Sequence, residues 1–73
     1  MIRKDALEAL QKTYPAGTRV VLVSMDDPEA PPPGTLGTVV AVDSLGTVHV
    51  NWDNGSTLGV VYRVDSVRKE AQA

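Results

Sequence analysis

Cysteine and phenylalanine are absent from this sequence of 73 residues, which has one histidine, one tryptophan and two tyrosines. Without cysteine, neither a disulfide nor a thiolate zinc site can form, and one histidine is too few for a histidine metal cluster. We therefore expect no metal and no cofactor. A chain of this length buries little more than about 60% of the surface that its unfolded form exposes, so its core must be tightly packed and aliphatic. The absence of cysteine also fits a cytoplasmic location.

Neither sign of charge is in large excess, and long apolar runs are missing. The chain has 7 basic and 9 acidic residues, which gives a formal net charge of −2. Proteins that bind nucleic acid through its phosphates carry a basic excess, so this balance disfavours nucleic acid but leaves a local basic patch open. No apolar run approaches the roughly 20 residues of a membrane span, and no apolar segment follows the basic N-terminus. We expect neither a membrane helix nor a secretory signal.

A short amphipathic helix is predicted over residues 2–13, because apolar residues recur there at helical spacing: Ile2, Ala6, Leu7 and Leu10. Pro15 and Gly17 end the helix. A helix this short is marginally stable alone in water. We therefore expect it to dock on the first strand, on the face that carries Val21, Val23 and Met25.

From residue 18 onward the pattern changes to strands rich in β-branched residues. The predicted strands are 18–25, 38–43, 47–53, 56–62 and 67–69. A long loop, 26–37, contains the stretch "DDPEAPPPG", whose prolines exclude both helix and central strand. Asn54-Gly55 predicts a two-residue type I′ hairpin turn, and 63–66 predicts a single tight turn.

The order of these elements resembles a small SH3-like barrel of five strands preceded by a helix. The expected fold class is therefore mainly β. We divide the chain into an N-terminal helix (1–14), the barrel (15–70) and a tail (71–73). Barrels of this kind have many functions, so the fold does not decide the function.

The strand 47–53 carries both the tryptophan and the histidine. Side chains alternate along a strand, so Val48, Val50 and Trp52 share one face and His49 lies on the other. The valine face must be the core face. We therefore interpret Trp52 as a core residue; the alternative is an aromatic platform for a ligand at the barrel mouth. His49 is expected to be exposed.

Enzymatic activity is not expected. Nucleophilic catalysis needs a nucleophile, a base and a group that orients the base. His49 is the only histidine available as the base, and no nucleophile-elbow motif surrounds Ser24, Ser44 or Ser56. The neighbouring acids Asp26 and Asp27 lie in a loop that is expected to be solvated.

Motifs between residues 14 and 60 follow one another in a specific order and spacing: Tyr14-Pro15, Gly17-Thr18-Arg19-Val20, Met25, Asp27-Pro28, Pro33-Gly34-Thr35, Gly37-Thr38-Val39, Val42-Asp43, Gly46, Val50 and Trp52-Asp53-Asn54-Gly55-Ser56. With Asp65 and Arg68, they resemble a family of small bacterial and phage-borne domains, the domain-of-unknown-function family number 4314. The chain departs from it at Ser44, where a second acid is expected, and at Val61-Tyr62, where a break is expected. The resemblance implies no activity. Part of the pattern is also similar to SH3-like modules that bind protein segments.

The leading hypothesis is a non-catalytic module that binds a protein or peptide in a groove between the 26–37 loop and the hairpin tip, 52–56. Aromatic side chains line such grooves, and acids at the rim select basic segments. The residues expected to do so are Trp52, Tyr62, Asp26, Asp27 and Glu29, with Tyr14 as a further aromatic. A second possibility is that the proline-rich segment is itself a ligand, because such segments favour an extended left-handed helix. Otherwise this segment is only a stiff loop.

The alternative hypothesis is an accessory protein that binds nucleic acid. It requires one local basic patch near the last strand, formed by Arg19, Arg63, Arg68 and Lys69. Affinity that falls steeply with salt is the signature of such binding.

Overall fold

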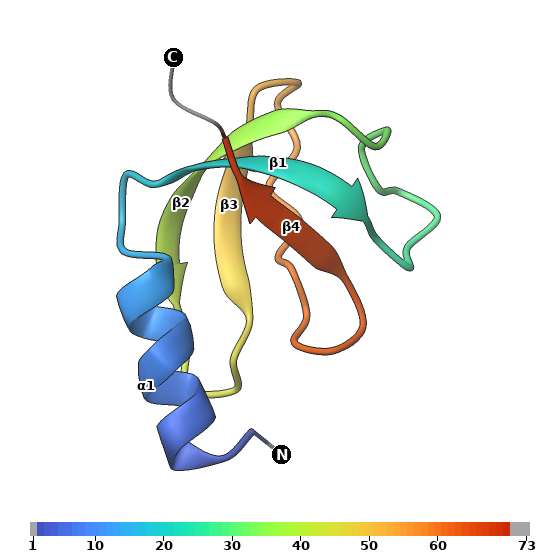
Figure 1. The fold of residues 1–73 in the computed structure, drawn as a ribbon. Coiled ribbons are helices and arrows are strands. Elements are labelled where there is room, and N and C mark those ends of the chain that lie inside the picture. The colour runs from blue at the N-terminus through green and yellow to red at the C-terminus, as the bar shows by residue number, and fades with distance from the viewer. Residues whose placement is uncertain (1, 71–73) are drawn as a thin grey trace.

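A computed structural model describes residues 2–70 of the chain, so the predicted tail lies outside the described residues. One helix, α1 (Lys4–Thr13), precedes four strands: β1 (Arg19–Ser24), β2 (Leu36–Val42), β3 (Val48–Trp52) and β4 (Ser66–Lys69). The strands form one antiparallel sheet in the order β3-β2-β1-β4 (Figure 1). The expectation of a mainly β fold with an N-terminal helix is confirmed. Among residues 2–70, no helix has the length and apolar character that crossing a membrane requires.

The core lies on one face of the curved sheet and is aliphatic apart from one indole: Val20, Leu22, Val39, Val48, Val50, Trp52 and Val60. Burial along β3 alternates strictly, because successive side chains point to opposite faces. Trp52 is only 3% exposed, whereas His49 is exposed. The prediction that tryptophan faces the core and histidine faces solvent is confirmed.

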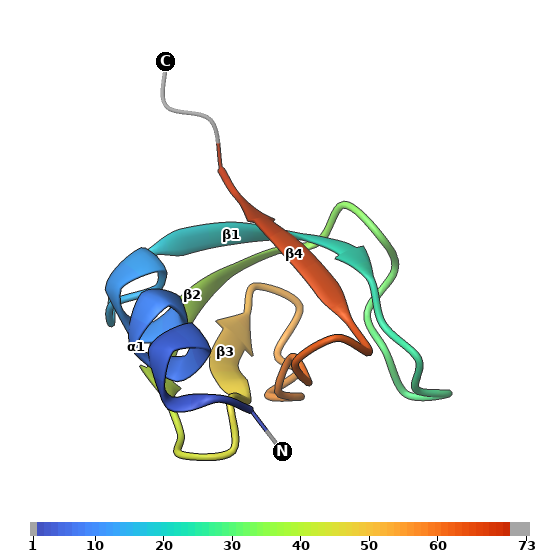
Figure 2. The same cartoon turned by 60° about the horizontal axis from the view of Figure 1, so that its bottom comes forward.

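The predicted dock for the helix is wrong. Leu10 and Tyr14 pack against the core, and α1 makes its contacts with β2 rather than β1 (Figure 2). Val23 stays 47% exposed on the outer face of the sheet. The reason is that Val20 and Leu22, on the opposite side of β1, line the core that the helix covers.

The hairpin after β3 is not a two-residue type I′ turn, which would need positive φ at both Asn54 and Gly55. Gly55 has φ +93°, whereas Asn54 is not among the positive-φ residues of the described chain. The Trp52 carbonyl accepts from Gly55 N–H (2.9 Å), and the Trp52 N–H donates to the Ser56 carbonyl (2.9 Å). This is a three-residue loop with a type I turn and a left-handed glycine. The Asn54 side chain stabilises it by accepting from Ser56 N–H.

The prediction of a regular strand over 56–62 is also wrong. The segment runs antiparallel to β3, but the two backbones meet only at the isolated bridge between Val48 and Val60 and at the Trp52–Ser56 hydrogen bond of the hairpin. These two residues exchange both backbone hydrogen bonds, at 2.9 and 2.8 Å. The described residues therefore form four strands in one open sheet, and the closed five-stranded barrel is not confirmed.

The backbone of Leu58 bonds to side chains and not to β3. The register of the hairpin places Leu58 opposite Val50, where a regular ladder would join their backbones. The Leu58 carbonyl instead accepts from the indole Nε1–H of Trp52 at 2.9 Å, and the Leu58 N–H donates to the Ser56 hydroxyl at 3.4 Å. The indole N–H is thereby satisfied in the core, and the middle rung of the ladder is lost.

Candidate functional site

The long loop between β1 and β2 is held in place at both ends. Near its end, Gly34 N–H donates to the Leu22 carbonyl (2.8 Å), and Leu22 N–H donates to the Thr35 carbonyl (2.9 Å). Pro31 is buried, so the proline-rich segment is partly covered by the protein itself. This placement favours the interpretation of a stiff connection over that of a free ligand.

The start of the loop is fixed by a residue that the sequence analysis did not select as a site residue. One carboxylate oxygen of Asp65 accepts from Asp26 N–H (2.8 Å), and the other accepts from Val61 N–H (2.9 Å). Asp65 thus joins the loop to the turn before β4, across 39 residues of sequence. No local sequence pattern indicates this role, because Asp65 and Asp26 lie 39 residues apart.

The acidic side chains of the loop point to solvent. Asp26, Asp27 and Glu29 are exposed, and none of them makes an ion pair with a cation of residues 2–70. Asp27 also shapes the loop, because its carboxylate accepts from Glu29 N–H at 2.7 Å. Three unneutralised carboxylates are therefore presented on a defined backbone.

The aromatic residues expected beside these acids lie elsewhere. The buried indole of Trp52 leaves almost no exposed ring face for a ligand. Tyr62 lies close to Gly46, just before the start of β3, whereas Trp52 ends that strand. Tyr62 and Tyr14 together line a small cavity of about 180 Å³ under α1. The structure therefore brings the acids of the loop together but does not place Trp52 or Tyr62 beside them as exposed aromatics.

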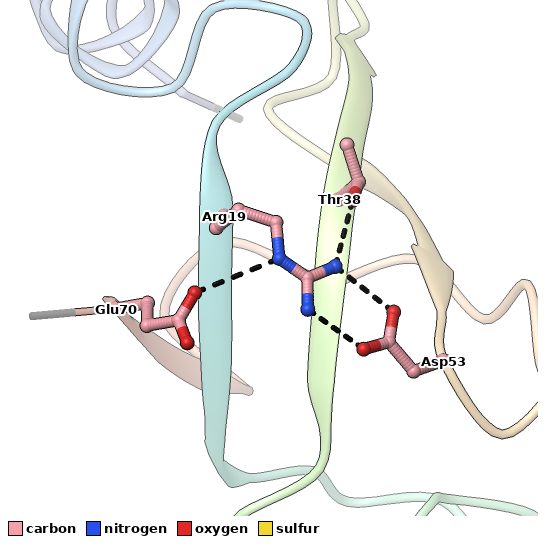
Figure 3. A network of polar contacts seen from close by, with 4 residues as sticks. All are labelled: Arg19, Thr38, Asp53 and Glu70. Carbon is pink, nitrogen blue, oxygen red and sulfur yellow. Dashed lines mark hydrogen bonds and ion pairs between the residues drawn. The ribbon is translucent and has the colours of Figure 1, made fainter. Parts of the chain in front are cut away.

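Arg19 is the centre of a polar network on the outer face of the sheet (Figure 3). Its guanidinium donates to both carboxylate oxygens of Asp53, at 2.9 and 2.7 Å, and to the Thr38 hydroxyl at 2.9 Å. Its Nε lies 3.6 Å from the carboxylate of Glu70. The hydrogen bond from Arg19 is the main cause that lowers the pKa of Asp53, and the same bond raises the pKa of Arg19. The network ties the ends of β3 and β4 to the middle of the sheet.

The basic residues of the alternative hypothesis do not form one patch. Arg19 is engaged by two carboxylates, and Arg63 stacks over the Tyr62 ring at 5.6 Å from its centroid. Arg68 pairs with Val21 and Lys69 with Val20 across the β1–β4 ladder, so these two side chains point to opposite faces.

His49 is paired with a carboxylate. Its Nε2 lies 2.9 Å from Asp43, whose other oxygen accepts from the N–H groups of Leu45 and Thr47. The hydrogen bond with His49, followed by that from Thr47, lowers the pKa of Asp43. Within residues 2–70, no hydrogen bond joins His49 to a serine. The pair fixes the turn between β2 and β3.

Acid is expected to weaken the fold through Asp53 and Asp43. Both have a lower pKa in the folded chain than the value of about 3.9 of an unfolded aspartate. Their contribution to stability is therefore complete above that pH and is lost as the pH falls through the folded-state pKa. We expect the urea midpoint to fall as the pH drops below about 4, and to fall less in Asp53→Asn. Asp27→Asn, which removes an unpaired acid, is the control and should keep the wild-type pH dependence; an unchanged dependence in Asp53→Asn would contradict the prediction.

Comparison with known proteins identifies the family. Neither curated proteins nor solved structures give a match to this chain. A family model described as "Domain of unknown function (DUF4314)" matches residues 3–70, which include α1, all four strands and the long loop. The chain therefore belongs to the DUF4314 family.

Proposed function

We propose that the chain is a non-catalytic module that binds a basic segment of a protein partner through the 26–37 loop and the adjoining hairpin tip, 52–56. The observation that carries the proposal is the set of three unpaired carboxylates on a loop whose backbone is fixed. The hairpin tip adjoins the loop, because Asp53 N–H donates to the Leu36 carbonyl at 2.8 Å.

A fixed loop favours binding, because the entropy of ordering it has already been lost on folding. Unpaired surface acids attract a basic partner and raise its association rate, and they disfavour acidic partners. Trp52 has a structural role in this scheme, so the surface uses charge and backbone shape rather than an aromatic groove.

We infer that the fold is a distorted SH3-like barrel in a cytoplasmic protein. The strand order and the long loop after β1 support this inference, and the 56–60 segment occupies the place of the missing strand. We also propose that the module is not an enzyme. His49 is engaged by Asp43, and within residues 2–70 no hydrogen bond joins a loop acid to a serine or threonine hydroxyl.

Nucleic acid is the less favoured partner. It would need the four basic residues to act together, and they are dispersed over the sheet, the turn and both faces of β4.

Capture of partner proteins by matched variants tests the proposal. The loop variant carries Asp27→Asn and Glu29→Gln, and the control carries Glu8→Lys on an exposed position of α1. Both raise the net charge by two units, and the Asp27→Asn change retains a side-chain oxygen that can accept from the Glu29 N–H. We expect the loop variant to lose partner binding by roughly tenfold, since each exposed ion pair contributes about 0.2–1 kcal/mol.

Nuclease-treated and untreated lysates form the two arms of this experiment. Capture that is insensitive to nuclease, and that is lost in the loop variant alone, supports the proposal. Capture that requires nucleic acid, or that is equal in the loop variant and the wild type, would refute it.

A further inference from the structure

A second hollow lies away from the acidic loop, between the N-terminal half of α1 and two turns. It has a volume of about 800 Å³. Ile2, Ala6 and Ala9 line it from the helix side, Leu45 from the turn after β2, and Tyr62 from the turn before β4. Figures 1 and 2 both show the turn after β2 beside the N-terminal half of α1. We call this hollow the helix cleft.

Exposed apolar side chains occur in a wall of the helix cleft and in the turn that carries Tyr62 and Arg63. Leu45 is 77% exposed, and in the neighbouring turn Val61 is 44% and Val64 55% exposed. Exposed apolar side chains that gather in one area are typical of interaction sites. A small molecule in the hollow would contact Leu45 but would leave Val61 and Val64, which do not line it, exposed, so their exposure favours a protein partner.

Within residues 2–70, Arg63 is the only cation of the helix cleft that forms no ion pair with an acid. Arg3 also lines the cleft, but its Nε lies 3.4 Å from the carboxylate of Asp5. Arg63 stacks over Tyr62, and no carboxylate of the described chain pairs with it. Its backbone has φ +64°, an uncommon conformation for a residue with a side chain.

We propose that the helix cleft binds an acidic segment of a partner protein, with an apolar side chain in the hollow and a carboxylate on Arg63. A guanidinium offers two parallel donors that match a carboxylate, and the stacked tyrosine ring limits its freedom before binding. This surface selects the opposite charge from the acidic loop. The module then has two separate docking surfaces, and the second does not depend on the first.

Amide NMR spectra of the labelled protein, titrated with two peptides, test this proposal. One is a hexapeptide, acetylated at its N-terminus and amidated at its C-terminus, in which two leucines are flanked by glutamates. The other peptide has glutamine in place of each glutamate. We expect the first peptide to shift the amide signals of Ala6, Leu45 and Tyr62 in a saturable way. The glutamine peptide should bind about tenfold more weakly, as the loss of a charge-assisted hydrogen bond predicts.

Matched variants locate the site. Arg63→Gln should weaken the glutamate peptide about tenfold, whereas Arg68→Gln, at another exposed arginine, should leave the affinity unchanged. Leu45→Ser should weaken both peptides, and Val23→Ser, at an exposed valine outside the cleft, should weaken neither. The Asp27→Asn, Glu29→Gln loop variant should bind like wild type, which separates this result from the test of the acidic loop.

Three outcomes would overturn the proposal. The first is the absence of saturable shifts at the cleft with either peptide. The second is equal affinity for the glutamate and glutamine peptides, because a carboxylate would then play no part. The third is a change of the same signals with protein concentration alone, since a second copy of the chain would then occupy the cleft.

Discussion

Trp52→Ala is expected to lower the free energy of unfolding by about 3–5 kcal/mol, the usual cost of truncating a buried tryptophan. The indole is 3% exposed and belongs to a core that otherwise consists of aliphatic side chains. Its removal leaves a cavity among these valines and also frees the Leu58 carbonyl that the indole N–H satisfies. Native domains have a total stability of only about 5–15 kcal/mol, so this variant should lose a large fraction of its stability and unfold at a much lower urea concentration.

Urea unfolding followed by far-ultraviolet circular dichroism measures this loss without depending on tryptophan fluorescence. Trp52→Phe separates the cost of the cavity from the cost of the lost hydrogen bond, because phenylalanine keeps most of the buried ring but has no N–H for the Leu58 carbonyl. We expect it to cost about 1–2 kcal/mol, the combined effect of an unpaired buried acceptor and a slightly smaller ring. A stability of Trp52→Ala within about 0.5 kcal/mol of wild type, as is usual for a surface substitution, would show that the indole is not part of the core.

The alternation of side chains explains how much of the fold could be predicted. Within a strand the period of two fixes the face of every residue once one face is known to be apolar. The positions of Val48 and Val50 therefore predict the faces of both Trp52 and His49, as the structure confirms. Pro15 and Gly17 likewise marked the end of the helix, since the described helix ends at Thr13.

Errors arose where the outcome depended on competition between two partners. The β-branched residues within 56–62 favour a strand, but the Leu58 carbonyl accepts from the indole of Trp52 and not from the backbone of β3. Asn54-Gly55 fits a type I′ turn as well as it fits a type I turn with a left-handed glycine. The hydrogen bond from Trp52 N–H to the Ser56 carbonyl closes a three-residue loop, and it therefore decides between the two turn types.

The polar contacts of the site could not be predicted for a different reason, which is their distance in sequence. Arg19 and Asp53 are 34 residues apart, and Asp26 and Asp65 are 39 residues apart. Their meeting depends on the register of the sheet and on the path of the loop. Composition identified the acids of the loop, but it did not indicate which carboxylate would fix its backbone.

Asp65→Ala is expected to release the long loop and to lower the free energy of unfolding by about 3 kcal/mol, the lower end of the combined contribution of two hydrogen bonds to a charged group. The substitution removes the acceptor of two backbone N–H groups, those of Asp26 and Val61, and each hydrogen bond to a charged group contributes about 1.5–3 kcal/mol. Asp65→Asn keeps one side-chain oxygen and should cost about half as much. Hydrogen exchange at the Asp26 and Val61 amides should accelerate in both variants, and Ser66→Ala, at the exposed neighbour, is the control.

The same variant separates loop order from loop charge in binding. Asp65→Ala retains the carboxylates of Asp26, Asp27 and Glu29, so the loop keeps the groups that would attract a basic partner. If the fixed backbone matters, the variant should nevertheless lose partner capture, because the partner must then supply the free energy that orders the loop. The loss should appear mainly as faster dissociation, whereas Asp27→Asn with Glu29→Gln should mainly slow association. Unchanged exchange at the Asp26 amide, or capture equal to wild type from a loop shown to be released, would contradict the role assigned to Asp65.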